Sequence, residues 1–133
     1  MMVYTICIGS NEQRRANLAL ARRRLSELFP GIRFSRMEET APLLLKRPAL
    51  FANQLARFAS DCPVNEVVAR LKAIEQEAGR THVETLQEII RLDIDLLSCD
   101  ATVYKPDDLR RDYVMRGLKE LETGLVSDVQ PRY

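Results

Sequence analysis

Apolar and polar positions divide the chain into short runs and longer periodic segments. An apolar run over residues 3–8 ends at Gly9, and further runs cover residues 32–37, 50–60 and 89–97. Glycine, proline or clusters of polar residues flank these runs. Runs of this length and flanking composition predict four β-strands.

Three longer segments have the apolar spacing of amphipathic helices. The first is expected over residues 10–29, where Ser10 and Gln13 fit a capping box. The second is expected over residues 61–79 and the last over residues 107–122. The remaining segments are rich in polar residues or proline, and they predict loops over residues 38–49 and 80–88.

The predicted order is strand, helix, strand, strand, helix, strand and an extra helix. Two strand–helix–strand halves of this kind form a ferredoxin-like βαββαβ sandwich. We therefore expect an α+β fold with an antiparallel sheet, helices packed on one face, and an extra C-terminal helix. A length of 133 residues suits one domain, predicted over residues 1–122, followed by a C-terminal tail of residues 123–133.

Two aspartates lie two residues apart within the apolar run over residues 89–97. Alternate side chains of a strand point to opposite faces, so the run separates into an apolar set and a charged set. The apolar set is Ile90, Leu92, Ile94 and Leu96, and the charged set is Arg91, Asp93 and Asp95. Two carboxylates on one strand face, with Cα atoms about 7 Å apart, repel each other unless a cation or a basic side chain lies between them.

Oxygen ligands of this kind suit Mg²⁺, which usually also holds substrate phosphates. The pair therefore predicts a Mg²⁺ site. The alternative is a polar strand face in contact with water, in which Arg91 pairs with Asp93.

The amino-acid composition argues against several classes of protein. Lys and Arg number 20 against 19 Asp and Glu, and this balance argues against a nucleic-acid partner. No segment approaches the ~20 apolar residues of a membrane span, and the N-terminus lacks a signal peptide pattern. The three cysteines lack the close spacing of a zinc or redox motif, which predicts a reduced, cytoplasmic protein. Cys7 is expected to be buried by packing.

Five short landmarks follow one another along the chain. They are Gly9-Ser10-Asn11, Glu39-Thr40-Ala41-Pro42, Phe51-Ala52-Asn53, Ile74-Glu75 with Gly79-Arg80, and Leu92-Asp93-Ile94-Asp95. In this order and spacing they resemble the 6-hydroxymethyl-7,8-dihydropterin pyrophosphokinase family, over roughly residues 4–121. The resemblance implies transfer of pyrophosphate from MgATP to the pterin alcohol in folate biosynthesis.

The resemblance also implies roles for individual residues. Asp93 and Asp95 would hold two Mg²⁺ ions that bridge the phosphates of ATP, and Arg80 and Arg91 would join them as catalytic residues. The pterin would contact Thr40, Ala41, Leu43, Phe51, Asn53 and Tyr113. The ATP side would comprise Glu75, Arg80, His82, Lys105 and Arg111.

The chain departs from the family pattern before the aspartates. The family usually has Gly-Arg-x-Arg and then Trp-Gly-Pro-Arg, whereas this chain has Gly79-Arg80-Thr81-His82 and Gln87-Glu88-Ile89-Ile90. Lys105 stands in place of a histidine that contacts ATP. Because loss of one charge-stabilising contact typically reduces a rate by about 10² to 10³, we expect weak activity.

Two alternatives stay open. One is an inactive relative that binds a pterin or a nucleotide, and the other is a ferredoxin-like interaction subunit without a small-molecule ligand. The sequence leaves the oligomeric state open.

Overall fold

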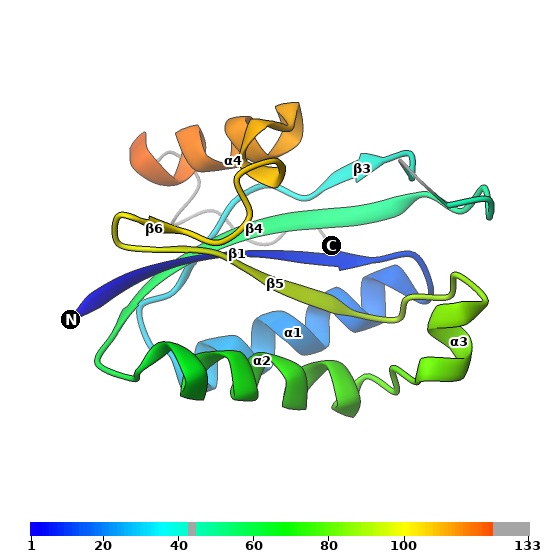
Figure 1. The fold of residues 1–133 in the computed structure, drawn as a ribbon, viewed down its shortest axis with the longest axis horizontal. Helices are drawn as coiled ribbons and strands as arrows, with labels where there is room; N and C mark the ends of the chain where they lie inside the picture. Colours follow the sequence, from blue (N-terminus) through cyan, green and yellow to red (C-terminus); the bar gives the residue numbers. More distant parts are fainter. Residues whose placement is uncertain (43–44, 124–133) are drawn as a thin grey trace.

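The computed structural model describes residues 1–42 and 45–123 of the chain (Figure 1). In chain order the elements are β1 (Met2–Ser10), α1 (Arg14–Leu28), β2 (Arg33–Phe34), β3 (Glu38–Thr40), β4 (Phe51–Ser60), α2 (Val64–Glu77), α3 (His82–Leu86), β5 (Asp93–Cys99), β6 (Thr102–Val103), the 3-10 turn η1 (Asp108–Arg110) and α4 (Asp112–Thr123).

The described strands form one six-stranded antiparallel sheet in the order β2-β4-β1-β5-β6, with β3 also paired to β4. The units β1–α1–β2 and β4–α2–β5 interleave, because each crosses over the first strand of the other. Helices α1 and α2 lie side by side on one face of the sheet, and α4 lies on the opposite face (Figure 1). The predicted ferredoxin-like α+β fold with an extra C-terminal helix is confirmed.

The larger core fills the space between the sheet and the helices α1 and α2. Tyr4, Ile6 and Ile8 alternate along β1 with side chains of the other face, and all three are fully buried against this helix layer. The Phe58 ring of β4 stacks on Phe29 at a centroid distance of 4.0 Å. This alternation leaves every second residue of β1 for the other face of the sheet, where the site lies.

A smaller core holds α4 against that second face. Leu55 of β4 and Leu97 of β5 pack there with Val114 and Leu121 of α4. Gly117 permits the close approach of the helix, because an added Cβ would lie 2.9 Å from Leu55 Cγ. The beginning of α4 is thereby fixed beside the exposed part of the sheet.

Three local predictions are wrong. Gln13, with a φ of 47°, precedes α1 without a side-chain cap, and Ser10 Oγ instead donates to the carbonyl of Glu12, so the capping box is absent. The segments predicted as loops over residues 38–49 and 80–88 contain strand β3 and helix α3. Thr81 caps α3 through a hydrogen bond from the backbone N–H of Glu84.

The aspartate strand is shorter than predicted, because β5 begins at Asp93 rather than at residue 89. Ile90 is half-buried and precedes the strand. The backbone N–H of Ile90 donates to Asn11 Oδ1 at 2.7 Å. Ile90 therefore binds the loop after β1 instead of pairing within the sheet. Leu92, Ile94 and Leu96 are buried as expected.

Helix α4 extends through Thr123, and the rest of the predicted tail lies outside the described residues. Within the described ranges, no helix has the length and apolar character needed to cross a membrane.

Candidate active site

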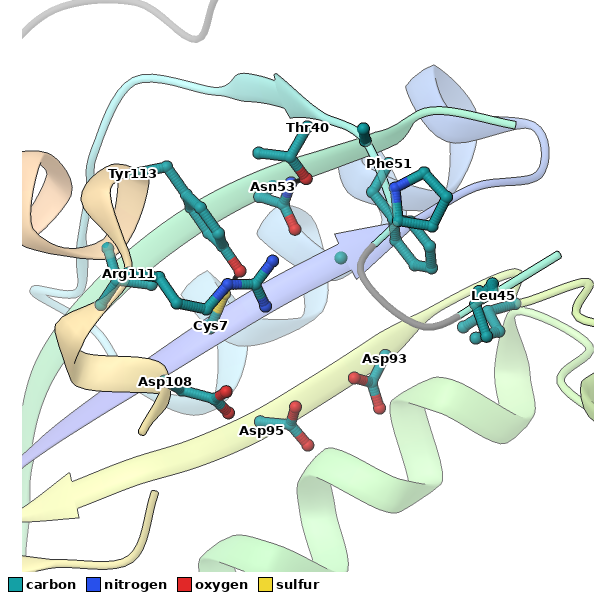
Figure 2. A pocket seen from close by; sticks show the side chains of 15 residues that line it. Cys7, Thr40, Leu45, Phe51, Asn53, Asp93, Asp95, Asp108, Arg111 and Tyr113 are labelled. Atoms are coloured by element: carbon teal, nitrogen blue, oxygen red, sulfur yellow. Dashed lines mark hydrogen bonds between the residues drawn. The ribbon is translucent and has the colours of Figure 1, made fainter. Parts of the chain in front are cut away.

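A cavity of about 210 Å³ opens on the face of the sheet that carries α4. Its walls come from β1, β3, β4, β5 and the start of α4 (Figure 2). The lining residues are Cys7, Gly9, Thr40, Ala41, Pro42, Leu45, Phe51, Asn53, Ile90, Asp93, Asp95, Asp108, Arg111, Tyr113 and Val114. The cavity therefore joins residues that lie more than one hundred positions apart in the sequence.

The register of the sheet explains how these side chains come together. Gly9 of the central strand pairs with Asn53 on one side and with Asp93 on the other. Cys7, the next residue of β1 on the same face, pairs with Asp95. Because Gly9 has no side chain, a hollow remains between Asn53 and Asp93; an added Cβ there would lie 3.3 Å from Asn53 Oδ1.

Hydrogen bonds fix the Asn53 amide at the edge of this hollow. Asn53 Nδ2 donates to Thr40 Oγ1 at 2.7 Å and to the carbonyl of Glu38 at 3.4 Å. The side-chain carbonyl is left facing the hollow beside Gly9, where it can accept a hydrogen bond from a ligand. Phe51, two residues before Asn53 on the same face of β4, adds an aromatic wall.

Asp93 and Asp95 project from β5 into the same cavity (Figure 2). Burial, the adjacent charge of Asp93 and a hydrogen bond with Asp93 raise the pKa of Asp95 to about 7, while Lys105 opposes this shift. Asp108 adds a further negative charge from the turn before α4. Close carboxylates repel each other when ionised, and a cation bound between them would relieve this repulsion.

A second cavity of about 410 Å³ lies between α2 and β5. Its lining combines apolar residues with charged groups: Val64, Val68, Leu71, Lys72, Glu75, Arg80, Asp93, Ile94, Asp95, Leu96, Tyr104 and Lys105. Asp93 and Asp95 thus line both cavities. A ligand in either cavity would meet the same pair of carboxylates.

Glu75 and Arg80 tie the end of α2 to the part of β5 that β6 does not cover. Glu75 Oε2 accepts a hydrogen bond from the N–H of Ile94 at 2.7 Å. Arg80 Nη1 donates to Asp93 Oδ1 at 2.8 Å and to the carbonyl of Leu92 at 3.2 Å. Burial raises the pKa of Glu75, although the hydrogen bond from Ile94 acts in the opposite direction.

The residues present suit Mg²⁺ better than a closed structural metal site. Among the described residues, no three His, Cys, Asp or Glu side chains gather closely enough to hold a metal ion. Mg²⁺ commonly uses one or two protein carboxylates and takes its other ligands from water and phosphates. The pair of Asp93 and Asp95, open to two cavities, fits this mode of binding.

The residues predicted to contact the pterin converge on the first cavity. Thr40, Ala41, Phe51, Asn53 and Tyr113 all line it together with the aspartates. The remaining member of this set, Leu43, lies outside the described residues.

The residues predicted for the ATP side are divided between three places. Glu75, Arg80 and Lys105 line the second cavity. Arg111 instead lines the first cavity, with its guanidinium carbon 4.8 Å from the centroid of the Tyr113 ring. His82 begins α3 and lines a polar hollow of about 330 Å³ next to the second cavity, away from the aspartates.

The prediction that Arg91 shares the strand face of the aspartates is wrong. Arg91 precedes β5, and its Nε and Nη2 atoms bind the two carboxylate oxygens of Glu84 at 2.8 and 2.9 Å. Its guanidinium therefore lines none of the three cavities described above. The alternative pairing of Arg91 with Asp93 is wrong too, because Arg80 takes that place.

Among the titratable side chains that line the first cavity, sequence reasoning missed those of Cys7 and Asp108. Cys7 is half-buried and packs against the smaller core, in line with the packing role predicted from the sequence, and its Sγ lies 4.0 Å from the Tyr113 hydroxyl. Burial raises the pKa of Cys7 to about 12, so the thiol stays protonated at neutral pH. Cys7 lies two residues before Gly9, so the alternation of a strand places both on the same face, and this spacing is a signal for Cys7 in the sequence. Asp108, in the turn η1, has no such periodicity.

Asn11 and Arg47 join the loops beside the first cavity. Asn11 is buried and donates from Nδ2 to the carbonyl of Glu88 at 2.8 Å, in addition to its bond with Ile90. The Arg47 side chain donates from Nη2 to Glu12 Oε1 at 3.0 Å, and the backbone N–H of Arg47 donates to Glu88 Oε1. The segment before β5 is therefore held to the end of β1 and to the loop before β4.

These features define an α+β protein of the ferredoxin-like class with a cavity on the sheet face opposite its paired helices. Residues 5–123 match the family described as 7,8-dihydro-6-hydroxymethylpterin-pyrophosphokinase (HPPK). The chain belongs to this family, whose members are pyrophosphokinases of folate biosynthesis.

Curated proteins include no significant match to the chain. Among solved structures, one similar chain is titled "De novo designed protein Foldit4". It is 12% identical, and the match covers 73% of this chain and 96% of that chain with a TM-score of 0.35. A likeness this distant carries no information about function.

Proposed function

We propose that the protein transfers pyrophosphate from MgATP to 6-hydroxymethyl-7,8-dihydropterin. The observation that carries this proposal is the position of Asp93 and Asp95, which line both cavities at once. A transfer between two small molecules needs such a shared wall, because the reacting groups must meet at the point where charge develops.

The first cavity suits the pterin. Phe51 and Tyr113 offer apolar ring faces, and Asn53 presents a fixed amide whose carbonyl can accept from a ring N–H. Thr40 completes this polar edge by holding the amide in place. The hydroxymethyl group of a pterin bound in this way would point toward the aspartates.

The second cavity suits the nucleotide. Its apolar side, formed by residues such as Val68 and Leu71, can cover a base, and Lys72, Arg80 and Lys105 offer positive charge for phosphates. Mg²⁺ held by Asp93 and Asp95 would neutralise charge on the phosphates during transfer. Arg111 adds a guanidinium to the first cavity, beside the Tyr113 ring.

Release of AMP tests this proposal directly. With MgATP and 6-hydroxymethyl-7,8-dihydropterin, the wild-type protein should release AMP at a rate that depends on both substrates. The Asp95→Ala variant should lower this rate by about 10² to 10³ or more. Equal AMP release by the wild-type and Asp95→Ala proteins, at the level of buffer alone, would contradict the proposal.

A second candidate is binding of the same ligands without turnover. It is favoured by Arg91, whose guanidinium is held by both carboxylate oxygens of Glu84 outside the cavities. Calorimetry separates the two functions: saturable heat with the pterin or ATP, but no AMP, would support the binding protein. A cytoplasmic location remains an expectation from the sequence.

A further inference from the structure

Arg80 occupies the position beside Asp93 that a cation would need. Its Nη1 lies 2.8 Å from Asp93 Oδ1, 3.2 Å from the carbonyl oxygen of Leu92 and 3.4 Å from Glu75 Oε2. One positively charged group is thus in contact with three oxygen atoms. Oxygen atoms of the same kinds bind divalent cations, so the guanidinium and a metal ion compete for Asp93.

The guanidinium is placed so that it can leave Asp93. The Arg80 side chain is 26% exposed, and it lines the second cavity as well as the neighbouring hollow that contains His82. Gly79, with a φ of 92°, separates it from the end of α2. A guanidinium binds phosphate oxygens in two parallel hydrogen bonds, so phosphates in this cavity would compete strongly with the single oxygen of Asp93.

We propose that Arg80 is a positioning residue that excludes free divalent cations from Asp93, so that metal enters only together with phosphates. This inference rests on the proposed function, in which Asp93 is a metal ligand. When the phosphates of a nucleotide enter the second cavity, the guanidinium transfers its hydrogen bonds to them. The Asp93 carboxylate then becomes free for the metal ion that the nucleotide carries.

Mn²⁺ binding, followed by electron paramagnetic resonance of the full chain, tests the proposal without any turnover. With MnCl₂ alone, the wild-type protein should bind Mn²⁺ weakly, and Arg80→Gln should bind it about 10- to 100-fold more tightly. If Arg80 had only a structural role, Arg80→Gln would bind Mn²⁺ more weakly than the wild-type protein, because loss of its hydrogen bonds would loosen the site. Addition of ATP should bring the wild-type affinity close to that of Arg80→Gln.

Arg70→Gln is the matched control, since it removes a guanidinium paired with the carboxylate of Glu66 outside the cavities. It should bind MnCl₂ as weakly as the wild-type protein. Arg80→Lys keeps a positive charge and should preserve most of the exclusion, which provides a second variant if Arg80→Gln does not fold. In the Arg80→Gln background, Asp93→Asn should abolish the tight binding of Mn²⁺.

The outcomes separate the two proposals. If wild-type protein binds MnCl₂ without ATP as tightly as Arg80→Gln, the exclusion by Arg80 is overturned and the proposed function stands. Tight binding that survives Asp93→Asn would also overturn it, because the ion would lie elsewhere. If none of these proteins binds Mn²⁺ even with ATP, the metal site of the proposed function is overturned together with the inference.

Discussion

Asn53 and Asp93 face each other across β1, because each is the register partner of Gly9. Asn53 and Asp93 lie forty positions apart in the sequence, yet in the sheet only Gly9, a residue without a side chain, lies between them. The width of the first cavity is therefore set by backbone pairing and by the absence of a single Cβ.

Gly9→Ala should weaken pterin binding about tenfold or more, because its Cβ would lie 3.3 Å from Asn53 Oδ1 and 3.7 Å from Phe51 Cδ1. The free energy of unfolding should fall by only about 1 kcal/mol, as expected for mild overpacking. Titration calorimetry with the pterin and urea unfolding measure the two effects. As a control, Ala59→Val adds volume at an exposed residue of β4 and should leave pterin binding unchanged. Equal pterin affinities of the wild-type, Gly9→Ala and Ala59→Val proteins would contradict this account of Gly9.

Asp95 should make the ligand-free protein less stable as the pH rises from about 4 to 7. Burial and the charge of Asp93 raise its pKa from 3.8 to about 7 in the folded protein, so the folded state binds the extra proton in this range. The unfolded state loses that proton near its ordinary pKa, and stability therefore falls with increasing pH. Asp95→Asn should remove this dependence.

At pH 8 in the absence of Mg²⁺, Asp95→Asn should be more stable than the wild-type protein by about 1 to 2 kcal/mol, because no buried charge remains at this position. Urea unfolding at pH 5 and pH 8 gives the comparison. Asp107→Asn changes an exposed aspartate and should follow the wild-type pH profile. Destabilisation of Asp95→Asn at pH 8 would show that the carboxylate is favourably placed without a metal.

Asn11→Ala should lower the free energy of unfolding by about 2 kcal/mol, because it leaves the N–H of Ile90 and the carbonyl of Glu88 without their buried partner. It should also speed hydrogen exchange at the Ile90 amide, which exchange measured by NMR can follow. Asn65→Ala, at an exposed position of α2, should change neither quantity. An unchanged Ile90 exchange rate in Asn11→Ala would mean that other contacts hold this segment.

Gly117→Ala should destabilise the protein by about 1 to 3 kcal/mol, because the new Cβ would lie 2.9 Å from Leu55 Cγ. Helix propensity alone predicts that Gly117→Ala is stabilising, since alanine is favoured over glycine by about 1 kcal/mol inside a helix. Thermal unfolding of the variant decides between these effects. A stabilised Gly117→Ala would contradict the close packing, and restoration of stability by Leu55→Ala in the same chain would support it.

The pattern of the sequence was sufficient for the fold but not for the segment before the aspartates. Periodicity placed α1, α2, α4 and the long strands, because their buried positions recur at fixed spacing. It failed at residues 89–92, where an apolar composition suits a strand but Asn11 binds Ile90 across 79 positions of sequence. The local pattern of apolar and polar residues does not indicate a hydrogen bond between positions so far apart in the sequence.

The site was predictable to a similar extent. The resemblance to a family identified the side chains that line the first cavity, since Thr40, Phe51, Asn53 and Tyr113 meet there with the aspartates. Ion pairing could not be predicted in the same way. Glu75, Asp93 and Glu84 all lie beside one of the two arginines. Only the folded loop determines that Arg80 pairs with Asp93 and Glu75 while Arg91 pairs with Glu84.

The central position of β1 has a consequence for folding. This strand is the first in the chain, yet its partners β4 and β5 begin at Phe51 and Asp93, so the cavity floor depends on contacts of long sequence separation. Such contacts form slowly because long loops must close first. Ligand binding should therefore appear only in the last phase of refolding, and fragments that lack β5 should not bind at all.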